Sequence, residues 1–304
     1  MKGSLLSFLN ARGGHYYYNP SAPFRLDGDP RAYLAVREEP ASKELESRTR
    51  FARLDREGWR LLDEPVLPLE DPAVSRVNNN LVLCGVRVTK KDPSRLEWRT
   101  DFYTMNSLES PEFLASGPPM MKDIRLVNLP EGVGVLTRPR GDHQHGAYGN
   151  GRVGYFVVSG LDELAALKGG EWYRRARILQ LPLQEGWWAG ANQGLAYETS
   201  EGVVIGVIGH QARWRGASRV YEAVAFTFTP GGERGSPPAL LPTGYRVIAR
   251  RREFLESEAK EGLAEVVFPG GIENPCEKRV VLYAGLSDRA CGVLPLENPF
   301  SPLL

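Results

Sequence analysis

Asp71 is the residue of this sequence that we first assign to acid chemistry. It lies in the segment LEDPAVSRV (69–77), directly before Pro72. Proline lacks an amide hydrogen and favours an extended residue before it, so we expect Asp71 to be extended at the start of a strand. Successive strand side chains point to opposite faces, so adjacency alone does not place Glu70 in the same site. The alternative is a solvated turn acid.

Cations follow in the segment 117–141. Alternation along a strand predicts that Asp123 and Arg125 share a face opposite Lys122, and Arg138 ends the next apolar run. Cations at corresponding ends of neighbouring strands can converge on an oxyanion, and arginine suits bidentate phosphate recognition. The alternative is ordinary ion pairing at the surface.

The segment GWWAGANQG (186–194) has the composition of a sugar site. Aromatic faces meet the C–H surfaces of sugars, and amides such as Asn192 bind hydroxyl groups. In an extended chain Trp187 and Trp188 point in opposite directions, so at most one of them faces a ligand and the other belongs to the core.

The histidines indicate a binding site less clearly than the carboxylates and cations do. His210 ends the apolar run VVIGVIGH, where a lone histidine is a structural residue unless an anion lies opposite it. His143 and His145 have a spacing that suits a metal, but no third ligand is near them, and we expect no metal site. The nearby GNGRVG stretch precedes a strand and not a helix, which excludes a dinucleotide loop.

The elements that position these residues are predicted to be strands. Short runs rich in β-branched and aromatic residues start at Leu81, Val133, Val153, Val203, Arg219, Arg246, Glu265 and Arg279. Helical periodicity is clear only from Leu161 to Gly170, and Pro230–Thr243 is predicted to be a long inter-strand loop. The pattern indicates an all-β fold, either a propeller or a large sandwich.

Composition excludes several function classes. Lysine and arginine (38) balance aspartate and glutamate (37), which gives no support for nucleic-acid or membrane-surface binding. The three cysteines form neither a disulfide framework nor a CxxC motif. No signal-peptide core and no apolar run of about 18 residues is present, so a cytoplasmic protein is expected.

Read in order, these segments resemble the mannosyltransferase-phosphorylase family (glycosyltransferase family 108) and, more distantly, the β-mannoside phosphorylases of glycoside hydrolase family 130. The matching segments are REEPASKELES (37–47), LEDPAVSRVNNNLVLCGVRV, GPPMMKDIRLVNL, GVGVLTRPRG, GWWAGAN, GVIGHQA, RVYEAVAFTF, EVVFPGGI and RVVLYAGLSD. They are collinear and cover nearly the whole chain. Ala73 and Gln193 depart from the pattern, because relatives carry an arginine and an acid at these places.

The resemblance implies one five-bladed propeller over residues 1–304 with a central active site. It implies that Asp71 is the catalytic acid and that Lys122, Arg138 and His210 hold phosphate, with Arg37 as a further cation. Asp288 falls where relatives contact sugar hydroxyls. The remaining substrate-binding candidates in the matching segments are Glu39, Asp123, Trp188, Asn192 and Tyr221.

The balance of charges favours a phosphorylase or transferase. An inverting hydrolase needs an acid and a second carboxylate that activates water. A phosphorylase needs the acid and a cationic cradle, since phosphate is already an anion. We therefore expect Asp71 to be the proton donor, with a β-mannooligosaccharide and phosphate or mannose 1-phosphate as partners and no other cofactor. Whether GDP-mannose is used, and the oligomeric state, are left open.

Two alternatives remain at this stage. One is an inverting β-mannosidase with Glu39, Asp123 or Asp288 as base, and the other is a sugar-binding propeller without activity. In a phosphorylase and in a mannosidase alike, Asp71 needs a raised pKa to donate a proton near neutral pH. Neighbouring cations oppose that, so we expect Asp71 to become a competent acid mainly when phosphate is bound.

Overall fold

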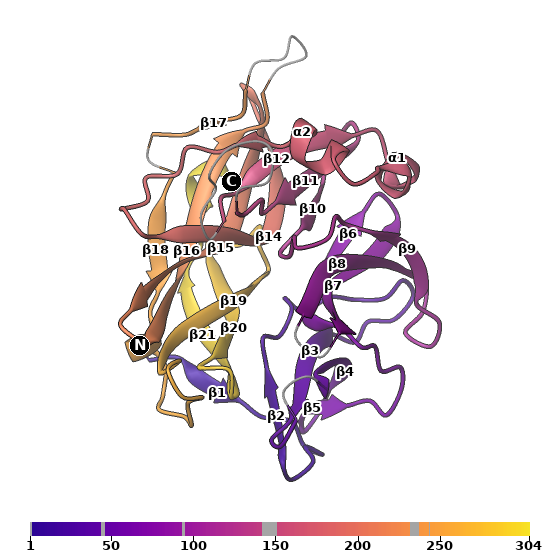
Figure 1. Ribbon diagram of the computed structural model, residues 1–304, viewed down its shortest axis with the longest axis vertical. Coiled ribbons are helices and arrows are strands. Elements are labelled where there is room, and N and C mark those ends of the chain that lie inside the picture. Colours follow the sequence, from indigo (N-terminus) through magenta and orange to yellow (C-terminus); the bar gives the residue numbers. More distant parts are fainter. Residues whose placement is uncertain (1, 44–45, 93–94, 142–150, 232–236, 243) are drawn as a thin grey trace.

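The computed structural model describes residues 2–43, 46–92, 95–141, 151–231, 237–242 and 244–304. Its strands form three four-stranded sheets and one nine-stranded sheet. Each four-stranded sheet is a meander of antiparallel strands that are neighbours in sequence (Figure 1). This confirms the all-β prediction.

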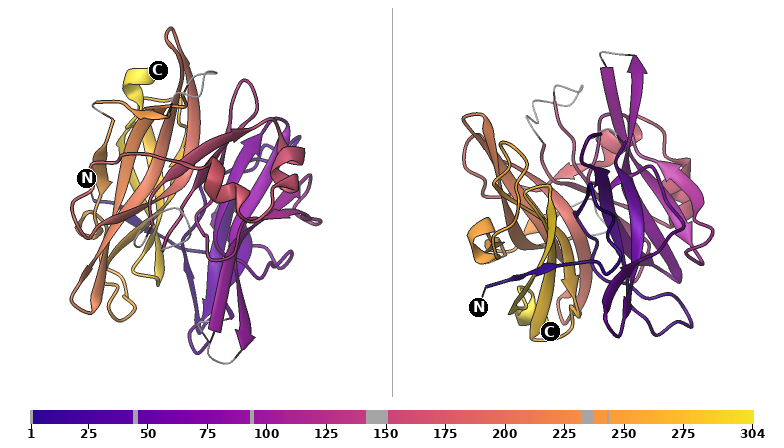
Figure 2. Two further views of the ribbon diagram at one scale, coloured as in Figure 1. Left: turned by 45° about the horizontal axis from the view of Figure 1, so that its top comes forward. Right: turned by 90° about the horizontal axis from the view of Figure 1, so that it is seen from below.

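Three meanders occupy the first 178 residues. The first contains β2 (His15–Tyr18), β3 (Tyr33–Pro40), β4 (Arg48–Asp55) and β5 (Gly58–Leu61). The second contains β6 (Glu70–Val77), β7 (Asn80–Asp92), β8 (Arg95–Met105) and β9 (Glu112–Ser116), and its β7–β8 hairpin extends beyond the neighbouring strands (Figure 2). The third contains β10 (Arg125–Asn128), β11 (Val133–Thr137), β12 (Gly154–Val158) and β13 (Arg177–Ile178).

The nine-stranded sheet consists of two meanders. The first contains β14 (Trp188–Thr199), β15 (Gly202–Arg215), β16 (Ser218–Thr229), β17 (Ala239–Leu240) and β18 (Arg246–Ala249). The second contains β19 (Glu265–Glu273), β20 (Arg279–Leu286), β21 (Ala290–Glu297) and β1 (Ser4–Leu6). The two halves meet through two parallel residue pairs between β16 and β19. β1 pairs with β21, so the sheet joins strands from both ends of the sequence.

The predicted apolar runs all lie in strands: β7, β11, β12, β15, β16, β18, β19 and β20. The predicted helix forms as α1 (Leu161–Ala166). The one-turn helix α2 (Glu171–Arg175) and the short 3₁₀ turns Arg251–Glu253 and Ser301–Leu303 were not predicted. The predicted loop at Pro230–Thr243 contains the two-residue strand β17.

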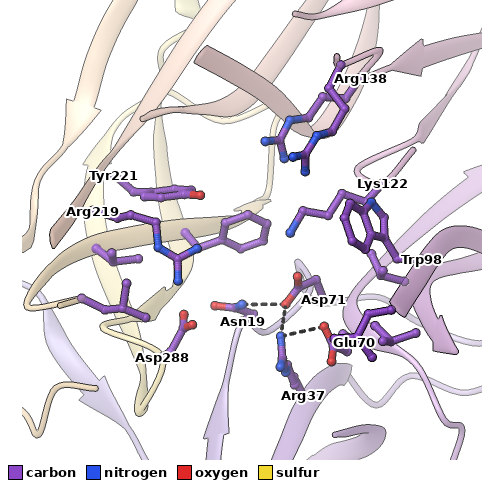
Figure 3. A pocket seen from close by; sticks show the side chains of 17 residues that line it. Asn19, Arg37, Glu70, Asp71, Trp98, Lys122, Arg138, Arg219, Tyr221 and Asp288 are labelled. Atoms are coloured by element: carbon purple, nitrogen blue, oxygen red, sulfur yellow. Dashed lines mark hydrogen bonds and ion pairs between the residues drawn. The ribbon is translucent and has the colours of Figure 1, made fainter. Parts of the chain in front are cut away.

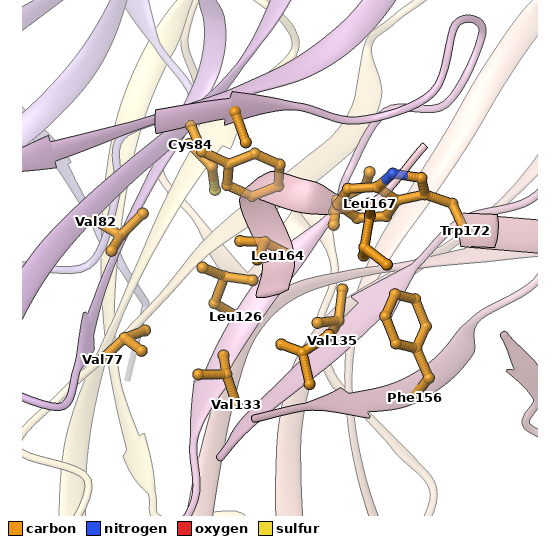
Figure 4. Packing of buried hydrophobic residues seen from close by; sticks show 14 of the residues in the cluster. Val77, Val82, Cys84, Leu126, Val133, Val135, Phe156, Leu164, Leu167 and Trp172 are labelled. Atoms are coloured by element: carbon orange, nitrogen blue, oxygen red, sulfur yellow. The ribbon is translucent and has the colours of Figure 1, made fainter. Parts of the chain in front are cut away.

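Apolar side chains fill the spaces between successive sheets. Figure 4 shows one such cluster, in which Val82 and Cys84 of β7 face Val133 and Val135 of β11. Trp172 of α2 closes the cluster and stacks on Phe102 with ring centroids 6.2 Å apart. Two buried aromatic rings of this size contribute several kcal/mol of hydrophobic stabilisation, at about 25 cal/mol per Å².

Four further clusters follow the same principle. They lie between the first and second meanders, between the third meander and β14–β16, between β14–β16 and β19–β21, and between β20–β21 and the first meander. Each sheet is therefore held on both faces by its neighbours. No helix in the described part of the chain is long and apolar enough to cross a membrane.

Candidate active site

A cavity of about 290 Å³ lies where the innermost strands of several sheets converge. Figure 3 shows Asp71 near its centre, with Lys122, Trp98 and Glu70 on one side and Tyr221, Arg219 and Asp288 on the other. Its lining residues are Asn19, Arg37, Glu70, Asp71, Val86, Val88, Leu96, Trp98, Lys122, Arg138, Arg140, Arg219, Tyr221, Leu263, Val266, Phe268 and Asp288. The cavity thus combines carboxylates, cations and aromatic rings.

A β-bulge brings Glu70 and Asp71 into this cavity together. The pairing of β6 with β7 shifts register between Glu70 and Ala73, and Asp71 has a φ of 50°. The expectation that Pro72 holds Asp71 extended is therefore wrong, and strand alternation does not apply across the bulge. Bulges of this kind redirect side chains next to active sites. Both carboxylates line the cavity.

Arg37 is the buried cation that organises these carboxylates. Its Nη1 atom lies 3.2 Å from Glu70 Oε2 and 3.2 Å from Asp71 Oδ1 (Figure 3). Its Nη2 atom donates to Glu39 at 3.1 Å, and its guanidinium lies over the ring of Tyr18. Asn19 adds a 2.7 Å hydrogen bond from Nδ2 to Asp71 Oδ1.

The two neighbouring carboxyl groups differ in pKa. Burial raises the pKa of Glu70 to about 6, against the attraction of Arg37, and the charge of Asp71 adds to the rise. Burial also acts upward on Asp71, but Arg37, Lys122 and Asn19 together hold its pKa below the ordinary value. The pair therefore favours an ionised Asp71 beside a more readily protonated Glu70.

Lys122 and Arg138 both line the cavity, as the sequence predicts for an anion site. Lys122 has no hydrogen bond or ion pair with the residues that the structure describes. Arg138 is 4% exposed and donates from Nη1 to Asp123, which is fully buried behind it. That arginine holds the pKa of Asp123 well below its usual range, against the effect of burial. Asp123 therefore supports a cation and does not face the cavity.

His210 and Asn192 lie one layer behind the cavity wall. His210 is completely buried, and its Nδ1 atom is 2.8 Å from Asn192 Oδ1. Burial lowers the pKa of His210 to about 3, so the ring is neutral at physiological pH. A Cβ on Gly190 would come within 2.5 Å of this ring, so the glycine allows the close approach. The structure does not bring His210 to the cavity surface with Lys122 and Arg138.

Some of the remaining sugar-binding candidates line the cavity, and the others are buried behind its wall. Tyr221 lines the cavity, whereas Trp188 is buried behind it with ring centroids 5.9 Å apart. Glu39 is also buried, and it accepts hydrogen bonds from Tyr18 and Arg37. Asp288 lines the cavity at a φ of 51°, and burial raises the pKa of its carboxyl group.

Sequence reasoning did not find several residues of the cavity: Asn19, Glu70, Trp98, Arg140, Arg219 and Phe268. Trp98 is positioned by β8, in the extended hairpin, and Arg140 stacks over it with its guanidinium carbon 5.2 Å from the ring centroid. Asn19 shares one sequence feature with Asp71, because both residues precede a proline. In the structure both have a φ of 50°. No group of three potential metal ligands occurs among the described residues, and His143 and His145 lie outside them.

A family model described as a protein of unknown function (DUF1861) matches residues 1–302. The chain belongs to this family. A search of curated proteins found no match for the DUF1861 chain. Solved structures give matches over nearly its full length.

MPT-4, a mannose phosphorylase from Leishmania mexicana solved with a phosphate ion, is 27% identical to the DUF1861 chain with a TM-score of 0.80. MPT-1, a GDP-Man-dependent mannosyltransferase from the same organism, is 25% identical with a TM-score of 0.79. Each alignment covers 99% of the DUF1861 chain and 90% of the other chain. These matches confirm the predicted resemblance to the mannosyltransferase-phosphorylase family.

A β-1,2-mannobiose phosphorylase from Listeria innocua shares the fold. Its TM-score is 0.67 at 16% identity, and the alignment covers 98% of the DUF1861 chain and 96% of that protein. The all-β architecture of the DUF1861 chain is therefore of the propeller type found in glycosidase-like enzymes.

Proposed function

We propose that this protein is an inverting β-mannoside phosphorylase or mannosyltransferase that uses inorganic phosphate or mannose 1-phosphate. The observation that carries the proposal is one cavity in which Asp71 faces a cluster of cations. Lys122 lacks an ion-pair partner among the described residues, and Arg138 is held by buried Asp123. Such a cradle suits a dianionic phosphate. The similarity to MPT-4 and MPT-1 supports this choice of substrates.

The fold that supports this site is, in our proposal, a single five-bladed propeller over residues 1–304. Four of the five meanders contain four strands, and the meander β14–β18 contains five because β17 and β18 both pair with β16. β1 completes the last meander beside β21. The five apolar clusters fall between successive meanders, which suits a ring. A cytoplasmic location stays a prediction.

In the proposed phosphorolysis, phosphate attacks the mannosyl anomeric carbon in a single inverting displacement. Asp71 donates a proton to the departing glycosidic oxygen, directly or through a sugar hydroxyl group. The phosphate is stabilised by three cations that line the cavity, Lys122, Arg138 and Arg37. Tyr221, Trp98 and Phe268 offer ring faces to the sugar, and Asp288 offers a hydrogen-bond acceptor to its hydroxyl groups. The cavity wall is supported from behind by five buried residues: His210, Asn192, Asp123, Glu39 and Trp188.

A product assay tests the proposal. β-1,2-Mannobiose is incubated with the enzyme with and without phosphate, and the products are separated by ion chromatography. We expect mannose 1-phosphate only when phosphate is present, and mannobiose formation in the reverse direction. Lys122→Met should raise the KM for phosphate at least about tenfold while the KM for the mannoside changes little. Release of free mannose at an equal rate without phosphate would instead identify a hydrolase.

Two further assays test transfer from a nucleotide sugar and sugar binding without activity. GDP-mannose replaces mannose 1-phosphate as donor, and consumption of GDP-mannose would assign the protein to transfer from a nucleotide sugar. Binding of mannobiose without turnover of any donor, measured by calorimetry, would leave a sugar-binding protein.

A further inference from the structure

Glu70 is a cavity carboxyl group that the mechanism above does not use. Its side chain is 18% exposed, compared with 6% for Asp71, so it is the more accessible of the two. Oxygens of both groups contact the same nitrogen, Arg37 Nη1, at 3.2 Å. They therefore lie within two hydrogen-bond lengths of each other, a separation that one water molecule can bridge.

The charges around the pair stabilise the two carboxylates unequally. The charges of Arg37 on β3 and of Lys122 before β10 act on both carboxyl groups, and that of Glu39 acts on Glu70. The charges of Asp123 and Asp288 act on Asp71, which alone accepts the hydrogen bond from Asn19. Two carboxylates that share one site do not readily ionise together. Since the hydrogen bond from Asn19 stabilises the charge on Asp71, and the pKa of Glu70 is raised, Glu70 is the group that is protonated when the pair holds one proton.

We propose that Glu70 is the group of this pair that takes up a proton, and that it passes this proton to Asp71, which then donates it to the glycosidic oxygen. This inference rests on the proposed function. In phosphorolysis the bond between the anomeric carbon and the glycosidic oxygen breaks, and a bond to a phosphate oxygen forms. The leaving oxygen gains the proton of the pair, and hydrogen phosphate loses its own proton, which recharges Glu70. No proton is gained or lost overall.

Changing the leaving group tests the proton path. Glu70→Gln keeps the shape of the side chain but cannot supply a proton. We expect its kcat for phosphorolysis of mannobiose to fall at least about tenfold, because an alkoxide leaving group needs protonation. With 4-nitrophenyl β-mannoside, whose leaving group departs as an anion, the loss should shrink to about threefold or less. An equal loss with both substrates would contradict the proposal and reduce Glu70 to a support for Arg37.

Glu39→Gln is the matched control. Glu39 also contacts Arg37, at 3.1 Å, but it is buried outside the cavity. In this variant the loss of support for Arg37 should lower the kcat for mannobiose and for 4-nitrophenyl β-mannoside by the same factor. A loss that depends on the leaving group in Glu39→Gln would show that the effect comes through Arg37 and would overturn the assignment to Glu70. Thermal melting confirms that each variant folds.

A titration that needs no turnover separates this inference from the proposed function. The glutamate carboxyl carbons are labelled with ¹³C, and the signal missing in Glu70→Gln is followed by NMR as the pH changes. We expect its midpoint near 6 in the wild type and a lower midpoint in Asp71→Asn, because the neighbouring negative charge is gone. A midpoint near the ordinary value of 4.5, or one that Asp71→Asn leaves unmoved, rejects the pair even if the enzyme is a phosphorylase.

Discussion

At the scale of single residues, Asp71 combines two requirements that conflict. A general acid must be protonated before it can act, yet Arg37, Lys122 and Asn19 hold the pKa of Asp71 down. Phosphate bound beside Lys122 would offset the cations, and Glu70 would supply the proton. The cluster therefore suits a reaction in which the anionic co-substrate is present before the acid functions.

The first prediction concerns Asp71 itself. Asp71→Asn preserves the side-chain shape and can keep a hydrogen bond with Asn19, but it has no proton to donate. We expect kcat to fall by about a hundredfold or more, with the KM for the mannoside changed by less than about threefold. Initial rates of mannose 1-phosphate formation measure both constants. Near-normal turnover in the folded variant would show that the proton comes from another group.

His210 gives a second prediction at this scale, on stability. Its pKa falls from 6.5 to about 3 on folding, chiefly through burial, so the folded state binds the proton less readily than the unfolded state. The resulting stability is fully present above pH 6.5 and is lost as the pH falls toward 3. Between pH 7 and pH 5 the loss from this one group is about 2 kcal/mol.

Urea denaturation at pH 7 and pH 5 measures this loss. His210→Gln cannot titrate, so the variant should lose about 2 kcal/mol less than the wild type over this interval. Identical pH dependence in the two proteins would mean that His210 takes up a proton as readily in the folded state as in the unfolded state, and that burial does not keep the ring neutral.

At the scale of elements, the sequence predicts the strands and several site residues, but it does not predict how a β-bulge changes the direction of their side chains. Asp71, Lys122 and Arg138 could be identified because carboxylates and cations at the ends of apolar runs carry a chemical signal. Glu70 could not, because strand alternation places it on the opposite face until the bulge at Asp71 and Pro72 is known. The depth of His210 behind the wall depends on Gly190 of the neighbouring strand, a contact between strands that no local pattern contains.

Trp98 and Arg140 illustrate a second limit. They come from different meanders and meet at the cavity, which the β7–β8 hairpin lines with Val86, Val88 and Leu96 as well. Short-range patterns predict a hairpin but not the surface that its side chains reach. The choice between propeller and sandwich is likewise decided by packing between distant strands and by the family resemblance, since the strand pattern fits both.

At the scale of the whole molecule, the pairing of β1 with β21 connects the first residues to the last sheet. Three residue pairs form this contact, and Gly3 donates a backbone hydrogen bond to Glu253 at 2.7 Å. A Cβ on Gly3 would lie 2.7 Å from the carbonyl oxygen of Val293, so the strand packs closely there. Because cohesion between the terminal meanders depends partly on this strand, it should affect the stability of the entire fold.

Deletion of residues 2–6 tests this dependence. The deletion removes several backbone hydrogen bonds, each contributing about 1 kcal/mol, and leaves the edge of β21 unpaired. We expect the free energy of unfolding to fall by about 2 to 4 kcal/mol and the Tm by several degrees, measured by urea denaturation and calorimetry. Leu5→Ser is the control, since Leu5 is 41% exposed and its substitution keeps the backbone pairing. If the deletion is no more destabilising than Leu5→Ser, β1 is a peripheral strand and the two terminal meanders hold together without it.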